Sequence, residues 1–202
     1  MSVVSANNNA LSAISALPSS ISGGALTLIS TQTASSSASL DFTSGIDSTY
    51  KEYVFQIISV HPATANQRLT VNFRDGSTAF DATKTTTSFR AFHPEDDGET
   101  PAVGYITSTD LAQGTGDQPL FIGAVGNDND SSGCGNLHLF DPSNTTFVKH
   151  FIFRGSSHQE SAMACDSFVA GYCNVTAAID GVQFKFASGN IDSGVIKLYG
   201  IS

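Results

Sequence analysis

The stretch YKEYVFQIISV, residues 50–60, carries the strongest strand signal in the chain. Its apolar side chains fall on two faces, with Tyr53, Phe55 and Ile57 on one face and Val54, Ile58 and Val60 on the other. Apolar residues on both faces are typical of a strand that is covered on two sides. We therefore expect a central strand of a sheet, or a strand at a subunit contact. His61-Pro62 should end this strand, because proline lacks the N–H that a ladder needs.

Shorter strands are expected on either side of this one. In residues 68–74 the side chains of Leu69, Val71 and Phe73 alternate with polar ones, as in a strand with one buried face. Further strands are expected at residues 26–31, 39–42, 85–92, 120–125, 136–140, 146–153, 167–175, 181–187 and 195–201. The turn sequence Asp141-Pro142-Ser143-Asn144 should join residues 136–140 and 146–153 as a hairpin. About eleven short strands without a long helix predict an all-β fold, an antiparallel β-sandwich that is jelly-roll-like.

The N-terminal segment has a different composition from the rest. Residues 1–40 contain no charged residue and no histidine. We divide the chain into an extended N-terminal docking arm, residues 1–24, and a β-sandwich body, residues 25–202. Leu11, Ile14 and Leu17 have helix-like spacing, so the arm forms one or two helical turns or stays disordered. A stretch this short is not stable alone, which suggests that it gains order on a partner.

The overall composition excludes several classes of partner. Hydrophobic residues make up 40% of the chain and charged residues 13%, and the net charge is −9. This balance disfavours nucleic acid and anionic membranes, which attract basic surfaces. No apolar run is long enough for a membrane span, and a signal peptide for export is not expected. The low charge suggests a surface that meets other protein; a neutral surface coated with Ser and Thr is the alternative.

Three cysteines do not form a disulfide framework. Cys165 and Cys173 could pair across neighbouring strands, although buried free thiols are favoured. Folding in a reducing cytosol is therefore expected.

Two acidic loops could bind a cation through oxygen. They are residues 126–133 (GNDNDSSG) and residues 95–99 (EDDGE). Ordinary polar loops are favoured for both, because the first lacks the acidic residue that closes a calcium-binding loop and the second is typical of a solvated acidic turn.

No catalytic motif stands out, and we predict no catalytic residue, no cofactor and no metal site. The five histidines lack metal-site spacing. Only His138 and His150, on the two arms of the expected hairpin, are candidate neighbours, and the register of the hairpin decides whether they meet. A Ser–His–Asp triad is left open, because such groups converge in space, but no Gly-x-Ser-x-Gly elbow is present.

The body resembles a group of short virion structural proteins from tailed phages of cyanobacteria and other aquatic bacteria. The resemblance extends from about residue 28 to the end and lies in FTSGIDSTYKEY (42–53), IISVHPAT (57–64), TTTSFRAFH (85–93), GNDND (126–130), LHLF (137–140), TFVKH (146–150), VAGY (169–172) and IDGVQFKFASGNIDSGVIKLYGI (179–201). Members of the group are head-decoration (cement) proteins or short tail-fibre components. The resemblance implies a virion surface protein with a jelly-roll-like body and carries over no catalytic residue.

We therefore expect a non-enzymatic bacteriophage virion protein, assembled in the bacterial cytoplasm and located on the outer surface of the particle. The first hypothesis is a capsid decoration protein, most simply a homotrimer, whose partners are the major capsid protein and sister copies. The alternative is a tail-fibre or receptor-binding component that binds tail proteins and, through residues 94–100 and 127–132, a host surface glycan. A carbohydrate-active enzyme on a jelly-roll fold is the third class, and the sequence places no pair of carboxylates for it.

Overall fold

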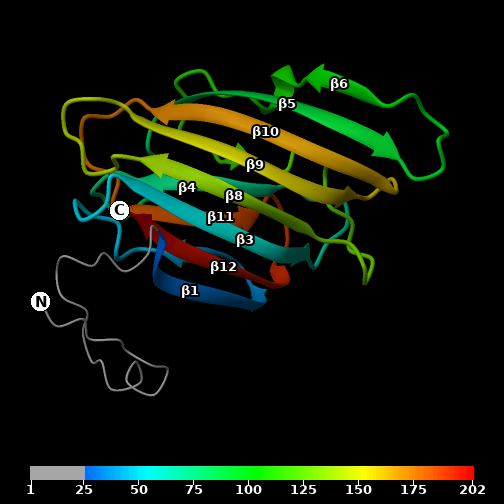
Figure 1. Ribbon diagram of the computed structural model, residues 1–202, viewed down its shortest axis with the longest axis horizontal. Coiled ribbons are helices and arrows are strands. Elements are labelled where there is room, and N and C mark those ends of the chain that lie inside the picture. Colours follow the sequence, from blue (N-terminus) through cyan, green and yellow to red (C-terminus); the bar gives the residue numbers. More distant parts are fainter. Residues whose placement is uncertain (1–25) are drawn as a thin grey trace, which may run out of the picture.

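Two antiparallel sheets face each other in residues 26–202, the part of the chain that the computed structural model describes (Figure 1). The large sheet contains, in spatial order, β1 (Leu26–Ser37), β12 (Ile191–Ile201), β3 (Glu52–Pro62), β8 (Gly133–Phe140), β9 (Lys149–Gln159), β10 (Met163–Cys173), β5 (Lys84–Pro94) and β6 (Ala102–Tyr105). The small sheet contains β2 (Leu40–Phe42), β11 (Gly181–Phe186), β4 (Leu69–Arg74) and β7 (Gln118–Pro119). One 3₁₀ turn, η1, covers Thr107–Thr109. Strands make up 56% of residues 26–202 and helix 2%, which confirms the predicted all-β sandwich.

The chain crosses between the sheets in the manner of a jelly roll. In the large sheet β1 and β3 flank β12, and in the small sheet β2 and β4 flank β11. Successive strands therefore lie in opposite sheets at this end of the sandwich. At the other end β8, β9 and β10 follow each other as neighbours in one sheet.

Strand β3 lies inside the large sheet, between β12 and β8, as its sequence predicted. The side chains of Tyr53, Phe55 and Ile57 are at most 1% exposed and point into the core. On the opposite face Val54 is also buried, at 7% exposure. The strand ends at Pro62, also as predicted.

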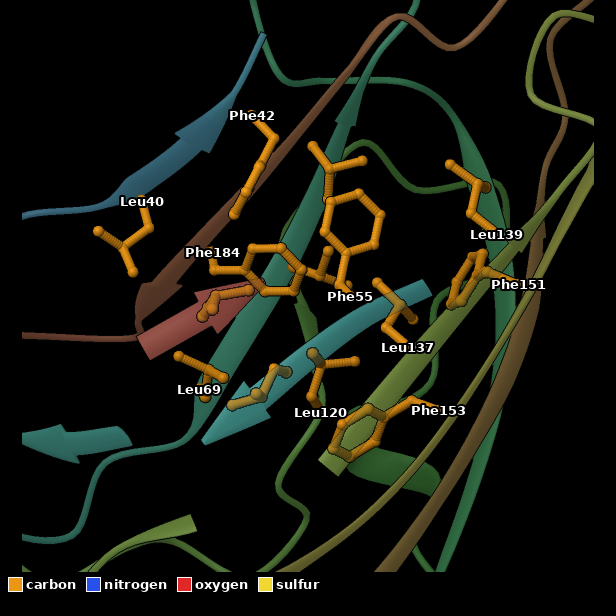
Figure 2. Packing of buried hydrophobic residues seen from close by; sticks show 14 of the residues in the cluster. Leu40, Phe42, Phe55, Leu69, Leu120, Leu137, Leu139, Phe151, Phe153 and Phe184 are labelled. Carbon is orange, nitrogen blue, oxygen red and sulfur yellow. The ribbon is translucent and has the colours of Figure 1, made fainter. Parts of the chain in front are cut away.

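Aromatic rings fill the space between the sheets (Figure 2). Phe55 of the large sheet lies 5.3 Å from Phe42 and 5.3 Å from Phe184, both of the small sheet, between ring centroids. Edge-to-face and tilted pairs of this kind add to the free energy gained by burying apolar surface. The core thus couples the two sheets through side chains far apart in sequence.

The predicted hairpin at Asp141–Asn144 is present. β8 and β9 pair antiparallel, with Leu137 opposite Phe153. However, β9 runs on to Gln159, beyond the predicted end at Phe153. The sequence after Phe153 is rich in Gly and Ser and lacks an apolar alternation, so the pattern gave no sign of this extension.

The predicted strand at residues 120–125 is wrong. This segment is a fully buried loop, and its apolar side chains fill the core as a strand's would. Its backbone bonds are scattered: the N–H of Leu120 donates to Leu69, that of Ile122 to the Ser167 hydroxyl and that of Val125 to Gln67. A buried apolar run therefore satisfies its polar groups without a ladder. The short strand β6 at Ala102–Tyr105 was not predicted.

The predicted docking arm, residues 1–24, lies outside the described residues, as does Ala25. Its helical or disordered state stays a prediction. The C-terminal strand was expected to pair, and β12 pairs on both sides, with β1 and β3.

Candidate functional site

An aromatic ridge lies on the outer face of the large sheet, over β5, β10 and β9. Phe89 and Phe168 are register partners, and their rings stack with centroids 4.5 Å apart and planes 6° from parallel. Arg154, the partner of Phe168 on the other side, places its guanidinium 4.8 Å from the centroid of the Phe168 ring. The Nη2 group of Arg154 also donates to Asp166 Oδ2 at 2.9 Å. The two rings and the guanidinium form one continuous stack.

Shallow hollows flank this ridge. Two of them, about 420 and 270 Å³, share Thr87, Ile152 and Ala170, which are register partners across β5, β9 and β10. We call this pair of hollows the trough. A third hollow of about 450 Å³ lies on the other side of the ridge, where Ala91 and Asp166 are partners. Small side chains at the flanking positions leave the ridge standing above the sheet.

Exposed apolar side chains gather around the ridge. Of the seven large apolar side chains exposed in residues 26–202, four lie here: Phe89, Val103, Tyr105 and Ile152. Together with Phe168 they form what we call the outer patch. An antiparallel sheet that faces water is normally polar on that face, and a gathered apolar patch is typical of a surface that binds another molecule. The sequence contained part of this signal, since Phe168, Ala170 and Tyr172 alternate onto one face, but not which strands lie beside them.

The two loops singled out in the sequence meet at one end of the sandwich, through His158 of β9. The Ser131 hydroxyl lies 2.8 Å from His158 Nδ1, and Glu95 Oε1 lies 3.2 Å from His158 Nε2. His61 Nδ1 bonds the Ser131 carbonyl at 2.7 Å. One histidine thus links the loop at residues 94–100 with the loop at residues 127–132.

A serine, a histidine and a carboxylate in hydrogen-bonded order are also the parts of a hydrolytic triad. Here Ser131 is only 2% exposed, so its hydroxyl is not open to a substrate carbonyl. The carboxylate of Glu95 is 63% exposed and therefore screened by water. We interpret the three residues as a clamp that fixes the two loops.

The acidic loops show no built cation site. Within residues 26–202, no three His, Cys, Asp or Glu side chains gather closely enough to hold a metal ion. In the loop at residues 95–99, Asp97 lies 3.4 Å from His93, and Asp96 accepts from the Gly98 N–H at 2.8 Å. These contacts are those of a polar turn.

The register of the hairpin does not place His138 opposite His150. His138 lies opposite Ile152, and its Nδ1 is 2.6 Å from Glu52 Oε1. His150 packs against the ring of Tyr172, with centroids 5.9 Å apart. The two histidines therefore have separate partners.

All three cysteines are free, and Cys165 and Cys173 are buried, as favoured from the sequence. They lie on the same strand, β10, rather than on neighbouring strands, so they cannot pair. Burial raises the pKa of the Cys173 thiol to about 12. Cys134 is exposed.

Two buried lysines flank Cys173, which the sequence did not reveal. Lys84 and Lys149 are its partners on β5 and β9, and both are fully buried. Lys84 Nζ donates to the carbonyls of Ala82 and Gly116 at 2.9 Å, and Lys149 Nζ donates to Val175. Burial lowers the pKa of both ammonium groups. Because the ammonium groups bind main-chain carbonyls, we interpret the lysines as supports for the loops at this end of the sandwich.

Comparison with known proteins adds no relative: no family model matches the chain, and no curated protein matches its sequence. In the part of the chain that the structure describes, no helix has the length and apolarity needed to cross a membrane.

Proposed function

We propose that the protein is a structural component of a bacteriophage virion, and within that class a capsid decoration protein that stabilises the head shell. The observation that supports this proposal most is the outer patch. On a chain of net charge −9, the charged groups beside the ridge, Arg154 and Asp166, neutralise each other. An exposed apolar sheet face suits contact with a large protein surface. The resemblance of the body to phage virion proteins supports the same class.

In this proposal the arm, residues 1–24, adds a second attachment to the shell. The arm carries no charge and many small side chains, which allow close backbone approach. An extended segment of this kind can add a strand to an exposed sheet edge of the major capsid protein or of a sister copy. Two linked attachments bind more tightly than either alone, and bridging between subunits would stabilise the shell. The trimer expected from the sequence stays a prediction.

Deletion of residues 2–24 tests the arm. Purified virions that lack the protein would be incubated with the full-length chain or with the deleted chain, and the bound protein measured by gel densitometry. We expect occupancy to fall by at least about tenfold, because the second attachment is lost. The deleted chain should keep its unfolding transition, which shows that the body is intact. Unchanged occupancy would contradict the proposed role of the arm.

The number of copies per virion tests the location. A decoration protein is present in hundreds of copies, in proportion to the capsid subunits, whereas a tail component is present in a few to tens. Immunogold labelling of intact particles gives an independent answer. Label confined to the tail tip would contradict the head assignment.

The second candidate function is a tail-fibre or receptor-binding component. The observation that favours it is the clamp, because His158 brings together the two loops that the sequence suggested as host contacts. Exposed Tyr105 lies just beyond the loop at residues 94–100 and offers a ring on which a sugar could stack. Replacing Asp96 and Asp97 by alanine should then reduce adsorption to host cells without changing the amount of protein in the virion. Unchanged adsorption would contradict this candidate.

A further inference from the structure

The four edges of the two sheets differ sharply in length. The large sheet ends at β1 and β6, and the small sheet ends at β2 and β7. Strands β6, β2 and β7 contain four, three and two residues, whereas β1 contains twelve. Pro119 lies in β7, and Pro101 directly precedes β6. Short strands and prolines are the usual protection of a sheet edge against pairing with another chain. Three edges therefore have this protection and β1 does not.

Strand β1 also lacks the charges that usually protect a long edge. Its sequence, LTLISTQTASSS, contains no charged residue and no proline. One bulge interrupts the pairing with β12 at Ile29, and Ser36 has a φ of 50°. Between them, residues 30–35 pair with β12 without interruption. Within residues 26–202 no strand pairs with the other side of β1, where it forms the edge of the sheet in Figure 1.

Exposed apolar side chains also lie at the start of β1. Leu26 and Leu28 are 50% and 53% exposed. Unpaired main-chain N–H and C=O groups of an edge strand are a template for a further strand. Unpaired main-chain groups together with exposed leucines fit a protein partner that supplies a strand.

We propose that β1 pairs with β1 of a second copy of this chain, antiparallel and about a twofold axis. The chain carries a net charge of −9, so two copies repel each other over most surfaces, but β1 brings no charge to the contact. A twofold contact uses the same strand from both copies and satisfies both long edges at once. The joined sheet then ends at two β6 strands, which are short. A single strand from an unrelated partner would cover β1 but leave its own far side open.

The arm of residues 1–24 is the alternative occupant of this edge, since it directly precedes β1 and is also uncharged. The twofold pair requires no residue before Leu26. Deletion of residues 2–24 therefore separates the two occupants, because it removes the arm and leaves β1 complete.

The test uses the purified full-length chain without virions, so it stands apart from the proposed virion role. We expect sedimentation velocity to show a concentration-dependent dimer. In the dimer, amide hydrogen exchange should slow at residues 30–35 relative to dilute protein. Thr31→Lys with Thr33→Lys places four like charges at the contact and should raise the dimer dissociation constant by about tenfold or more. Both threonines are exposed, so the monomer should fold normally.

Thr87→Lys is the matched control. Thr87 is an exposed threonine of the same sheet, but it lies in the trough on β5 and not on β1. This variant should dimerise like the natural chain, and so should the chain that lacks residues 2–24. A monomer or a trimer at all concentrations overturns the proposal. So does a dimer that survives the two lysines on β1, that is lost on Thr87→Lys, or that is lost with the arm.

Discussion

Phe89 and Phe168 lie face to face on neighbouring strands of the large sheet, on the side that faces away from the core. Arg154 covers the other side of the Phe168 ring. The Phe168 ring therefore has a packing partner on both of its faces although it is not in the core. These contacts hold the side chains of the outer face in place.

The Phe168→Ala variant should lower the free energy of unfolding by about 1–2 kcal/mol, because it removes an aromatic pair and a cation–π contact. A double-mutant cycle with Phe89→Ala should give a coupling of about 0.5–1.5 kcal/mol, measured by urea denaturation. Strict additivity of the two substitutions would mean that the stack contributes nothing to stability.

Gly155 should not tolerate a side chain. It lies opposite Gly135 in the β8–β9 pair, and an added Cβ would lie 2.4 Å from Phe153 Cζ and 2.8 Å from the Cys134 carbonyl oxygen. The carbonyl belongs to the ladder and cannot move aside. The Gly155→Ala variant should therefore lose about 1–3 kcal/mol of unfolding free energy.

Gly104→Ala is the control for this substitution, because nothing lies within 4 Å of a Cβ at that position on β6. It should change the unfolding free energy by less than about 0.5 kcal/mol. Equal losses in the two variants would show that crowding at Gly155 is not the cause.

Lys84 should make stability depend on alkaline pH. Burial lowers its folded pKa below the ordinary lysine value of 10.5, so above that lowered pKa the folded protein loses a proton that the unfolded chain keeps. The unfolded state then binds more protons, and the unfolding free energy rises with pH until about 10.5. Urea denaturation between pH 7 and 10.5 should show this rise relative to a Lys84→Met variant.

Lys51→Met is a matched control, since the Lys51 side chain is 80% exposed. The same measurement on this variant shows how much of any change comes from removing a lysine rather than from its burial. A flat difference for Lys84→Met would mean that burial does not destabilise the charged form.

The thiols should differ in reactivity. Cys134 is exposed, whereas Cys165 and Cys173 are buried, and the pKa of Cys173 is raised to about 12. Because the thiolate is the reactive form, an aromatic disulfide reagent at pH 8 should modify one thiol in the native chain and three after unfolding. The Cys134→Ser variant should have no fast thiol. Fast modification of Cys173 in the native chain would contradict its burial.

His158→Ala should loosen the two loops that it joins. The substitution leaves the buried Ser131 hydroxyl without its partner, at a cost of about 1–3 kcal/mol. Limited proteolysis should then cut faster within residues 95–99 and 127–130, whereas His150→Ala, on the same strand, should change neither loop. Covalent labelling of Ser131 in the natural chain by a fluorophosphonate would contradict the clamp and indicate a reactive serine.

The sequence by itself determined the fold class, because strand periodicity is a local property. The alternation in residues 50–60 identified β3 as central, and the turn at residues 141–144 identified the β8–β9 hairpin. The local pattern did not predict the loop at residues 120–125 correctly. Its side chains are buried like those of a strand, but its backbone hydrogen bonds go to scattered partners instead of a neighbouring strand.

Only the tertiary structure decided which side chains meet. Phe89 and Phe168 are far apart in the chain, as are Ser131, His158 and Glu95, and their contacts depend on strand order and register. A shift of register by one residue would turn each side chain to the opposite face. The position of β1 at an edge likewise follows from strand order, which no local pattern encodes. The outer patch, the clamp and the unprotected edge therefore arise from topology. Most of the strands that carry these features could be predicted from the sequence.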